Sequence, residues 1–395
     1  MALLHQHLTA LPDPSAEEHA HSERLSALIR AEIARTGSIP FSRYMELALY
    51  APGLGYYAAG TQKFGAAGDF VTAAESFPVF GRCLARAARG IVEQLPGSNI
   101  LEAGAGSGKL AAALLNELAA LGALPQTYFI LELGADLRDR QATTVKEIAP
   151  DFVTRVRWLD RLPEPGFRGL VLANELLDAM PVERFKVVVD GVKQLGVTWR
   201  NDRFDWIEQP APPTVVDRIE PLALAPGYVS EIGLAAEAWV RSIGERIEAG
   251  VLLLIDYGFP RTEFYHPDRT TGTLMCHYRH RAHPDPLILP GLQDITAHVD
   301  FTAIAEAGAD VGLELLGYTS QAAFLIGSGL DEFVRASDPS DVRAHLALTE
   351  QIKKLTLPHE MGELYKVIGL GRGRNLELRG FRTQDRRGRL ELRFD

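Results

Sequence analysis

Short apolar runs alternate with stretches of helical periodicity through the centre of the chain, and this alternation constrains the fold more than any other feature of the sequence. Apolar runs that lack interleaved polar residues are typical of parallel strands buried on both faces of a sheet. We therefore predict a doubly wound α/β domain with a mostly parallel sheet over about residues 75–395. The strands that we predict are 99–104, 127–133, 155–159, 169–175 and 251–258.

Two inserted segments interrupt the alternation. Residues 183–230 predict antiparallel strands with turns at Asp190-Gly191 and Asn201-Asp202, and residues 259–300 are rich in histidine and proline. At the other end, a loose polar arm is expected over 1–21, followed by two helices up to about Ala48. The expected organisation is thus an N-terminal helical arm with a glycine-rich covering loop (1–75) and an α/β domain (76–395) with insertions near 183–230 and 259–300.

Charge and composition exclude several classes of protein. A net charge of −10 disfavours binding to nucleic acid, and no apolar stretch is long enough for a membrane span. The N-terminus has the features of neither a signal nor a transit peptide, so we expect a cytoplasmic protein if the source is bacterial. Cys83 and Cys276 lack metal-ligand spacing, and no metal is expected. A homodimer is left open.

A glycine-rich turn follows the first predicted strand and precedes a helix, with Gly104, Gly106 and Gly108 at alternate positions. Such a turn lets a ligand approach the backbone at a helix N-terminus. The dinucleotide fingerprint requires glycine or alanine at position 109, where this chain has lysine.

Two acids distinguish the ligand further. Glu102 would repel a pyrophosphate but suits an ammonium group, and Glu132, at the end of the second strand, can accept hydrogen bonds from both hydroxyls of a ribose. The pattern favours S-adenosylmethionine as the cofactor. The alternative is a tight strand-to-helix turn that binds nothing.

A second polar group follows the fourth predicted strand, at Asn174, Glu175 and Asp178. Ligands of α/β sheets bind at the carboxyl ends of the strands, so these side chains are candidate catalytic residues. The side-chain oxygen of Asn174 suits an acceptor nitrogen, and Glu175 with Asp178 can grip a guanidinium between two carboxylates. The alternative is that both acids cap a following helix.

Motifs along most of the chain resemble those of the MidA-like methyltransferases, a family that includes the mitochondrial complex I assembly factor. The segments that carry the resemblance are 46–58, 68–75, 173–182 and 290–301. It implies a class I methyltransferase fold, S-adenosylmethionine and, as for the mitochondrial member, arginine methylation on a complex I subunit. It also implies that Gly68, Thr72 and Glu75 lie beside the cofactor, together with the three glycines, Glu102, Glu132 and Asn174.

The segment 294–301 is a further candidate for the substrate entrance. We expect a helix to begin there with Thr296 near its N-cap, which would place His298 or Asp300 at the mouth of the pocket; His298 is our fourth catalytic candidate. The alternative is that both side chains only lock the inserted segment. The leading hypothesis for the whole chain is a protein arginine N-methyltransferase. A small-molecule methyltransferase and a cofactor-binding assembly factor without turnover are the alternatives.

Overall fold

The computed structural model describes residues 11–59 and 73–392, and these residues form two compact units. The first unit contains the described residues of 11–59, 178–236 and 262–298, and the second contains 73–177, 237–261 and 299–392. The N-terminal residues thus belong to one unit with most of the two inserted segments that the sequence predicted. Each unit is described below by itself.

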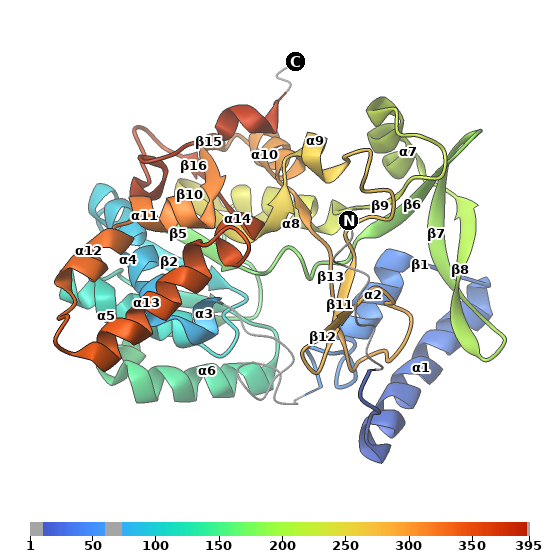
Figure 1. Ribbon diagram of the computed structural model, residues 1–395, viewed down its shortest axis with the longest axis horizontal. Helices are drawn as coiled ribbons and strands as arrows, with labels where there is room; N and C mark the ends of the chain where they lie inside the picture. Colours follow the sequence, from blue (N-terminus) through green and yellow to red (C-terminus); the bar gives the residue numbers. More distant parts are fainter. Residues whose placement is uncertain (1–10, 60–72, 393–395) are drawn as a thin grey trace. The chain divides into compact units, whose positions relative to one another are not determined.

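An eight-stranded sheet forms the centre of the second unit, with strand order β15-β16-β10-β5-β2-β3-β4 and β14 beside β10 (Figure 1). Neighbouring strands from β10 to β4 run parallel, whereas β16 runs antiparallel to both β10 and β15. The predicted mostly parallel sheet is confirmed. The strands are β2 (Asn99–Ala103), β3 (Tyr128–Leu131), β4 (Val156–Leu159), β5 (Phe167–Asn174), β10 (Ile247–Phe259), β14 (Val299–Asp300), β15 (Glu314–Ser320) and β16 (Tyr365–Arg372).

Apolar side chains cover both faces of this sheet, as the uninterrupted apolar runs require. Along β10, Leu253 and Ile255 enter the cluster formed with α4 and α5, while Leu252 and Leu254 are buried on the opposite face, which α10 contacts. The helices of this unit are α3 (Ala73–Ser76), α4 (Pro78–Gln94), α5 (Lys109–Ala120), α6 (Ala135–Ile148), α10 (Phe301–Asp310), α11 (Gln321–Gly327), α12 (Leu330–Ala336), α13 (Val342–Thr356) and α14 (Met361–Leu364). Helix α8 (Leu234–Gly244) spans the boundary between the units.

The first unit combines helices with two small antiparallel sheets. The hairpin turns predicted at Asp190-Gly191 and Asn201-Asp202 are present, and Asn201 and Asp202 have the positive φ values of +52° and +57° that a tight hairpin demands. The elements are α1 (Ala16–Thr36), β1 (Ile39–Pro40), α2 (Phe41–Tyr50), β6 (Glu183–Val188), β7 (Gly191–Arg200), β8 (Arg203–Pro210), α7 (Pro213–Ile219), β9 (Val229–Ile232), α9 (Arg261–Phe264), β11 (Met275–Tyr278), β12 (Arg281–His283) and β13 (Asp294–Thr296).

Two local expectations were wrong. The N-terminal arm is helical from Ala16 onward because Ser15 and Glu18 form a capping box at its start. Residues 294–296 do not begin a helix, because they pair with β11 as a strand. The helix begins at Phe301 with Asp300 as its N-cap, so Thr296 is not the cap.

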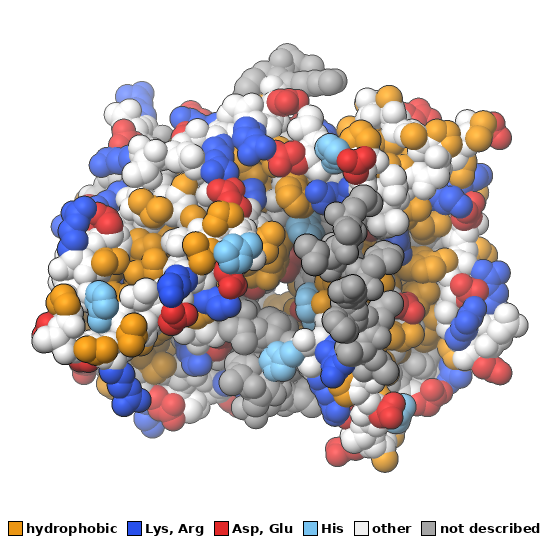
Figure 2. Space-filling view, in the orientation of Figure 1, with side chains coloured by type: hydrophobic (Ala, Val, Ile, Leu, Met, Phe, Trp, Pro, Cys, Tyr) orange, Lys and Arg blue, Asp and Glu red, His pale blue; other side chains and the backbone are white. Residues whose placement is uncertain are grey.

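The visible surface carries basic and acidic side chains side by side (Figure 2). This agrees with a chain in which 41 basic residues are mixed with 51 acidic ones. Within the described residues, no helix combines the length and apolar character that crossing a bilayer requires.

Candidate functional site

The strand order of the second unit reverses between β2 and β5, and the main polar groups of the site follow these two strands. Ala103 and Ala173 are partners in the register of this pair, so the turn after β2 and the bend after β5 leave the sheet at the same edge. Such a reversal opens a crevice at the carboxyl ends of the strands, where α/β proteins bind their ligands. The sequence-predicted site residues at 102–108 and 174–175 are therefore brought together.

The glycine-rich turn adopts a backbone conformation that residues with a side chain rarely adopt. Gly104, Gly106 and Gly108 have φ values of +72°, +51° and +87°. A Cβ atom on Gly106 would lie 3.2 Å from Oε1 of Glu75, and one on Gly108 would lie 3.0 Å from the Cα atom of Gln141. Glycine is therefore required both by the conformation and by the space.

Glu75 reaches this turn from α3. Its Oε1 accepts a hydrogen bond of 3.0 Å from the Ser107 backbone N–H, and its Oε2 lies 3.4 Å from Nζ of Lys109. Only 6% of the Glu75 side chain is exposed. The structure thus places Glu75, which the family resemblance suggested, directly against the glycine-rich turn. Gly68 and Thr72, suggested on the same grounds, lie outside the described residues.

Glu132 follows β3, the strand next to β2, and an amide ties it to the turn. Nε2 of Gln141 donates to Oε2 of Glu132 (3.0 Å) and to the carbonyl of Gly106 (3.1 Å), while its Oε1 accepts from Nε1 of Trp158 (2.9 Å). Gly134 donates its backbone N–H to Oε1 of Glu132. Each carboxylate oxygen can accept a further hydrogen bond, so Glu132 retains acceptor capacity.

Gln141 and Trp158 were missed from the sequence. Gln141 is fully buried and lies on α6, nine residues after the acid that it holds. A buried glutamine on an otherwise polar helix is a local signal for such a bridge, but the signal does not name the partner.

Glu102 lies beneath the turn, and only 2% of its surface is exposed. Its Oε2 accepts a hydrogen bond of 2.6 Å from the Tyr128 hydroxyl. Burial raises the pKa of the Glu102 carboxyl to about 7, although the bond from Tyr128 opposes that rise and the nearby Glu75 adds to it. Contact between Glu102 and an ammonium group stays a prediction.

Asn174 ends β5 with a buried amide. Its Nδ2 donates to Oε1 of Glu175 (3.1 Å), whereas its Oδ1 is buried and accepts no hydrogen bond from the residues that the structure describes. A buried acceptor without a donor is costly, and this one lies at the carboxyl end of the strand, where the ligand was predicted.

Glu175 follows in a strained conformation, with a φ of +54° that residues other than glycine rarely adopt. Burial raises the pKa of its carboxyl to about 8, against the lowering effect of a 2.9 Å hydrogen bond from the Tyr365 hydroxyl. Oδ2 of Asp256 accepts the backbone N–H groups of Leu176 and Leu177 and so holds the bend. Strain and a raised pKa at one residue are typical of functional sites.

The bend after β5 excludes one interpretation of these acids. Residues 175–182, all of them described, form bends and a turn that lead into β6, so Glu175 and Asp178 cap no helix here. Asp178 lies in the first unit, where its carbonyl accepts the backbone N–H of Ala297 at 2.9 Å, next to His298. The pairing of Glu175 with Asp178 stays a prediction.

The segment that contains His298 and Asp300 is tied to its own surroundings. The His298 backbone N–H donates to the hydroxyl of Thr273 (3.1 Å). The Asp300 carboxylate caps α10 and lies 3.1 Å from Nε of Arg261. These contacts give the Asp300 carboxylate a structural role as helix cap and partner of Arg261. The role of His298 stays a prediction.

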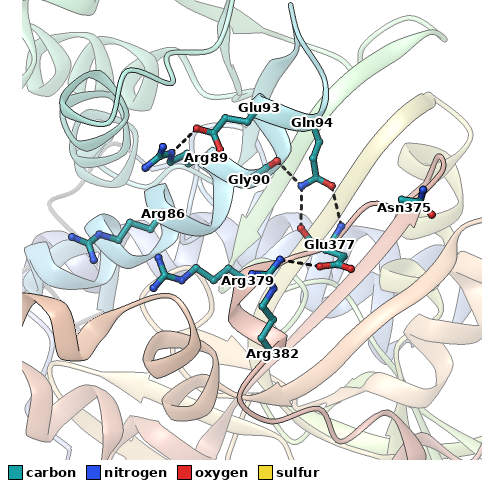
Figure 3. A pocket seen from close by; sticks show the side chains of 9 residues that line it. All are labelled: Arg86, Arg89, Gly90, Glu93, Gln94, Asn375, Glu377, Arg379 and Arg382. Carbon is teal, nitrogen blue, oxygen red and sulfur yellow. Dashed lines mark hydrogen bonds and ion pairs between the residues drawn. The ribbon is translucent and has the colours of Figure 1, made fainter.

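A separate groove of about 510 Å³ lies on the second unit between the C-terminal half of α4 and residues 375–382 (Figure 3). Helix α4 ends just before β2 begins, so this groove lies at the edge where the parallel strands start, opposite the site described above. Its four guanidiniums are already paired: Arg89 with Glu93, Arg382 with Glu377, and both Arg86 and Arg379 with Glu332. The groove is not part of the candidate site.

Similar proteins identify the ligand class. A crystal structure of a Burkholderia thailandensis protein bound to S-adenosyl-homocysteine superposes with a TM-score of 0.93 at 47% sequence identity, covering 96% of this chain and 100% of that one. A native crystal structure from the same organism superposes with a TM-score of 0.91 at 46% identity, with the same coverage. Fold, site and these structures define an S-adenosylmethionine-dependent methyltransferase with a class I α/β fold.

The family follows from two further comparisons. A family model for S-adenosyl-L-methionine-dependent methyltransferases matches residues 83–319. The mitochondrial protein arginine methyltransferase NDUFAF7 of Mus musculus is 28% identical over 90% of this chain and 87% of its own, and the Drosophila melanogaster homologue is 28% identical over 91% and 87%. The chain belongs to this family of methyltransferases, and the MidA-like resemblance is confirmed.

The residues of the site fit S-adenosylmethionine, which is the cofactor. Glycines at 104, 106 and 108 keep the turn after β2 narrow, and a Cβ atom at Gly106 would lie 3.2 Å from the Glu75 carboxylate. Carboxylates at Glu75 and Glu102 suit a cationic amino-acid end, and Glu132 suits a diol.

Proposed function

We propose that the chain is a protein arginine N-methyltransferase. The observation that carries the proposal is the pair at the end of β5: the buried, unsatisfied Oδ1 of Asn174 beside the Glu175 carboxylate. An acceptor oxygen next to an anionic group suits the N–H edge of a guanidinium, which is planar, cationic and rich in donors. The protein arginine methyltransferases among its relatives support the same substrate class.

The cofactor side of the proposal assigns one role to each group. Gly104, Gly106 and Gly108 leave room for the methionine end, Glu75 and Glu102 compensate its ammonium, and Glu132 binds the ribose hydroxyls. Gly68 and Thr72 belong to this side on the strength of the family resemblance. When bound, S-adenosylmethionine supplies an electrophilic methyl group on a sulfonium.

On the acceptor side, Asn174 orients the nitrogen through its Oδ1, and Glu175 binds the guanidinium and accepts the proton that the nitrogen loses. Orientation and proton acceptance are the two tasks that methyl transfer to a cationic nucleophile demands of its enzyme. We assign Asp178 to the same clamp and His298 to the substrate entrance.

A respiratory-complex subunit is the first protein substrate to test, because the family resemblance points to it. The cytoplasm is the compartment that we propose, since a bacterial neighbour with 47% identity supports a bacterial setting.

Transfer of labelled methyl groups tests the proposal. The purified chain is incubated with methyl-labelled S-adenosylmethionine and cell extract, and labelled proteins are hydrolysed to identify the modified amino acid. Methylarginine is the expected product. Label only in low-mass compounds would establish a small-molecule methyltransferase, and cofactor binding without transfer would establish an assembly factor.

Glu175→Gln is the matched variant, because it keeps the shape of the side chain and removes its charge. We expect transfer to fall at least about a hundredfold while the affinity for S-adenosylmethionine in calorimetry stays within about twofold. Transfer at the wild-type rate would contradict the role of Glu175.

A further inference from the structure

A chain of hydroxyl groups leads to Glu175 through the interior of the second unit. Tyr365, at the start of β16, is 1% exposed and donates to Oε2 of Glu175 at 2.9 Å. Its hydroxyl is also hydrogen-bonded to that of Tyr257 on β10. The two rings pack against each other at an interplanar angle of 36°, with their centroids 4.0 Å apart, so packing restricts both hydroxyls. Neither tyrosine has a role in the proposed function so far.

The groups that face Glu175 are few. Hydrogen bonds reach its carboxylate from the Tyr365 hydroxyl, the Asn174 amide and the backbone of Ala73 on α3, and Asp256 on β10 adds a negative charge nearby. Among the residues that the structure describes, the side chains that shift its titration are Tyr365, Asp256 and Asn174, and none of them is a cation. The hydroxyl of Tyr365 is the strongest of the influences that favour the charged carboxylate.

The number of available protons determines the direction of the two hydrogen bonds. A phenol carries one proton, so when Tyr365 donates to the ionised Glu175, the proton between the two hydroxyls comes from Tyr257. Both hydrogen bonds then point toward the carboxylate and favour its charged form. A hydrogen bond to a charged group in a site of low polarity is among the stronger kinds.

We propose that Tyr365, supported by Tyr257, is a positioning residue that orients Glu175 and favours its ionised, proton-accepting form for methyl transfer. The inference rests on the proposed function. In the transfer step the acceptor nitrogen bonds to the methyl carbon, and the carbon–sulfur bond breaks with its electron pair left on sulfur. The proton of the acceptor N–H passes to Glu175, which releases it to solvent afterwards, so atoms and charge balance without another reactant.

Titration of Glu175 in the full chain tests this without any substrate. The chain is prepared with ¹³C-labelled glutamate, and the Glu175 carboxyl signal is identified by its loss in Glu175→Gln. We expect the titration midpoint to rise by about one pH unit or more in Tyr365→Phe, because the bond to the charged form is lost. In Tyr257→Phe it should rise by a smaller amount. Tyr44→Phe, which removes a buried hydroxyl from the first unit, should leave it unchanged.

A kinetic readout separates positioning from a purely structural role. At pH 7.5, Tyr365→Phe should transfer methyl groups about tenfold more slowly than the wild type and recover as the pH rises, with its cofactor affinity unchanged. An unmoved Glu175 midpoint in a folded Tyr365→Phe chain would overturn the inference. If that variant did not fold, an unmoved midpoint in Tyr257→Phe would do so. A shifted midpoint without methylation of any arginine would refute the proposed function alone.

Discussion

Replacing Glu102 by glutamine should stabilise the ligand-free protein at alkaline pH. Burial raises the pKa of the Glu102 carboxyl from its ordinary 4.5 to about 7, so the folded state keeps a proton that the unfolded state releases between these values. Stability therefore falls as pH rises through that window, and the full cost is present above about pH 7. At about 1.4 kcal/mol for each pH unit, the cost comes to about 3 kcal/mol.

Glutamine removes the charge and keeps an oxygen that can accept the 2.6 Å hydrogen bond from Tyr128. We expect the free energies of unfolding of the wild type and Glu102→Gln to differ by less than about 1 kcal/mol at pH 5, and the variant to be more stable by up to about 3 kcal/mol at pH 8. Urea unfolding without cofactor, at pH 5, 6, 7 and 8, measures this difference.

The surface variant Glu93→Gln provides the control, because Glu93 is 53% exposed and pairs with Arg89 on the same helix. Its difference from the wild type should not vary over this pH range. A Glu102→Gln difference that is equally flat, or a variant less stable than the wild type at pH 8, would refute the reasoning from burial.

Three further substitutions test the site and the fold. Gly106→Val should abolish S-adenosylmethionine binding in calorimetry, because φ is +51° there and a Cβ atom would lie 3.2 Å from Glu75; unchanged affinity would refute the position of the site. Gln141→Leu should lower the cofactor affinity about tenfold and the free energy of unfolding by about 2 kcal/mol, since its three hydrogen bonds are lost; a calorimetric affinity equal to that of the wild type would show that the bridge is dispensable. Asp300→Ala should cost about 1 kcal/mol in urea unfolding through the loss of the α10 cap but leave cofactor affinity unchanged, and weaker binding would connect this residue to the site after all.

The parallel core could be predicted because its pattern is local. The apolar runs of β2, β5 and β10 are buried on both faces, so these strands could be predicted without knowledge of their neighbours. Strands β15 and β16 were not predicted. Strand β16 pairs with β10 and with β15 across long stretches of chain, and glycines and polar residues interrupt the apolar runs of both β15 and β16.

The site was predictable to the extent that strand ends and glycine spacing define it. Glu132 and Asn174 lie where the ends of β3 and β5 were expected. Tyr365 was missed because it meets Glu175 from 190 positions further along the chain, and its sequence neighbourhood carries no chemical pattern. Thr296 was taken for a helix cap because hydroxyl residues are good N-caps, but pairing with β11 outweighed that preference.

The left-handed backbone of Glu175 has a consequence for how members of this family diverge. A side chain in that conformation costs roughly 1–3 kcal/mol, a burden that glycine would remove. A lineage released from the need to transfer methyl groups would therefore gain stability by exchanging this acid for glycine, while its cofactor turn could remain intact. A homologue with that exchange would be expected to bind the cofactor but not to transfer methyl groups. The residue at this position would then distinguish active enzymes from inactive homologues.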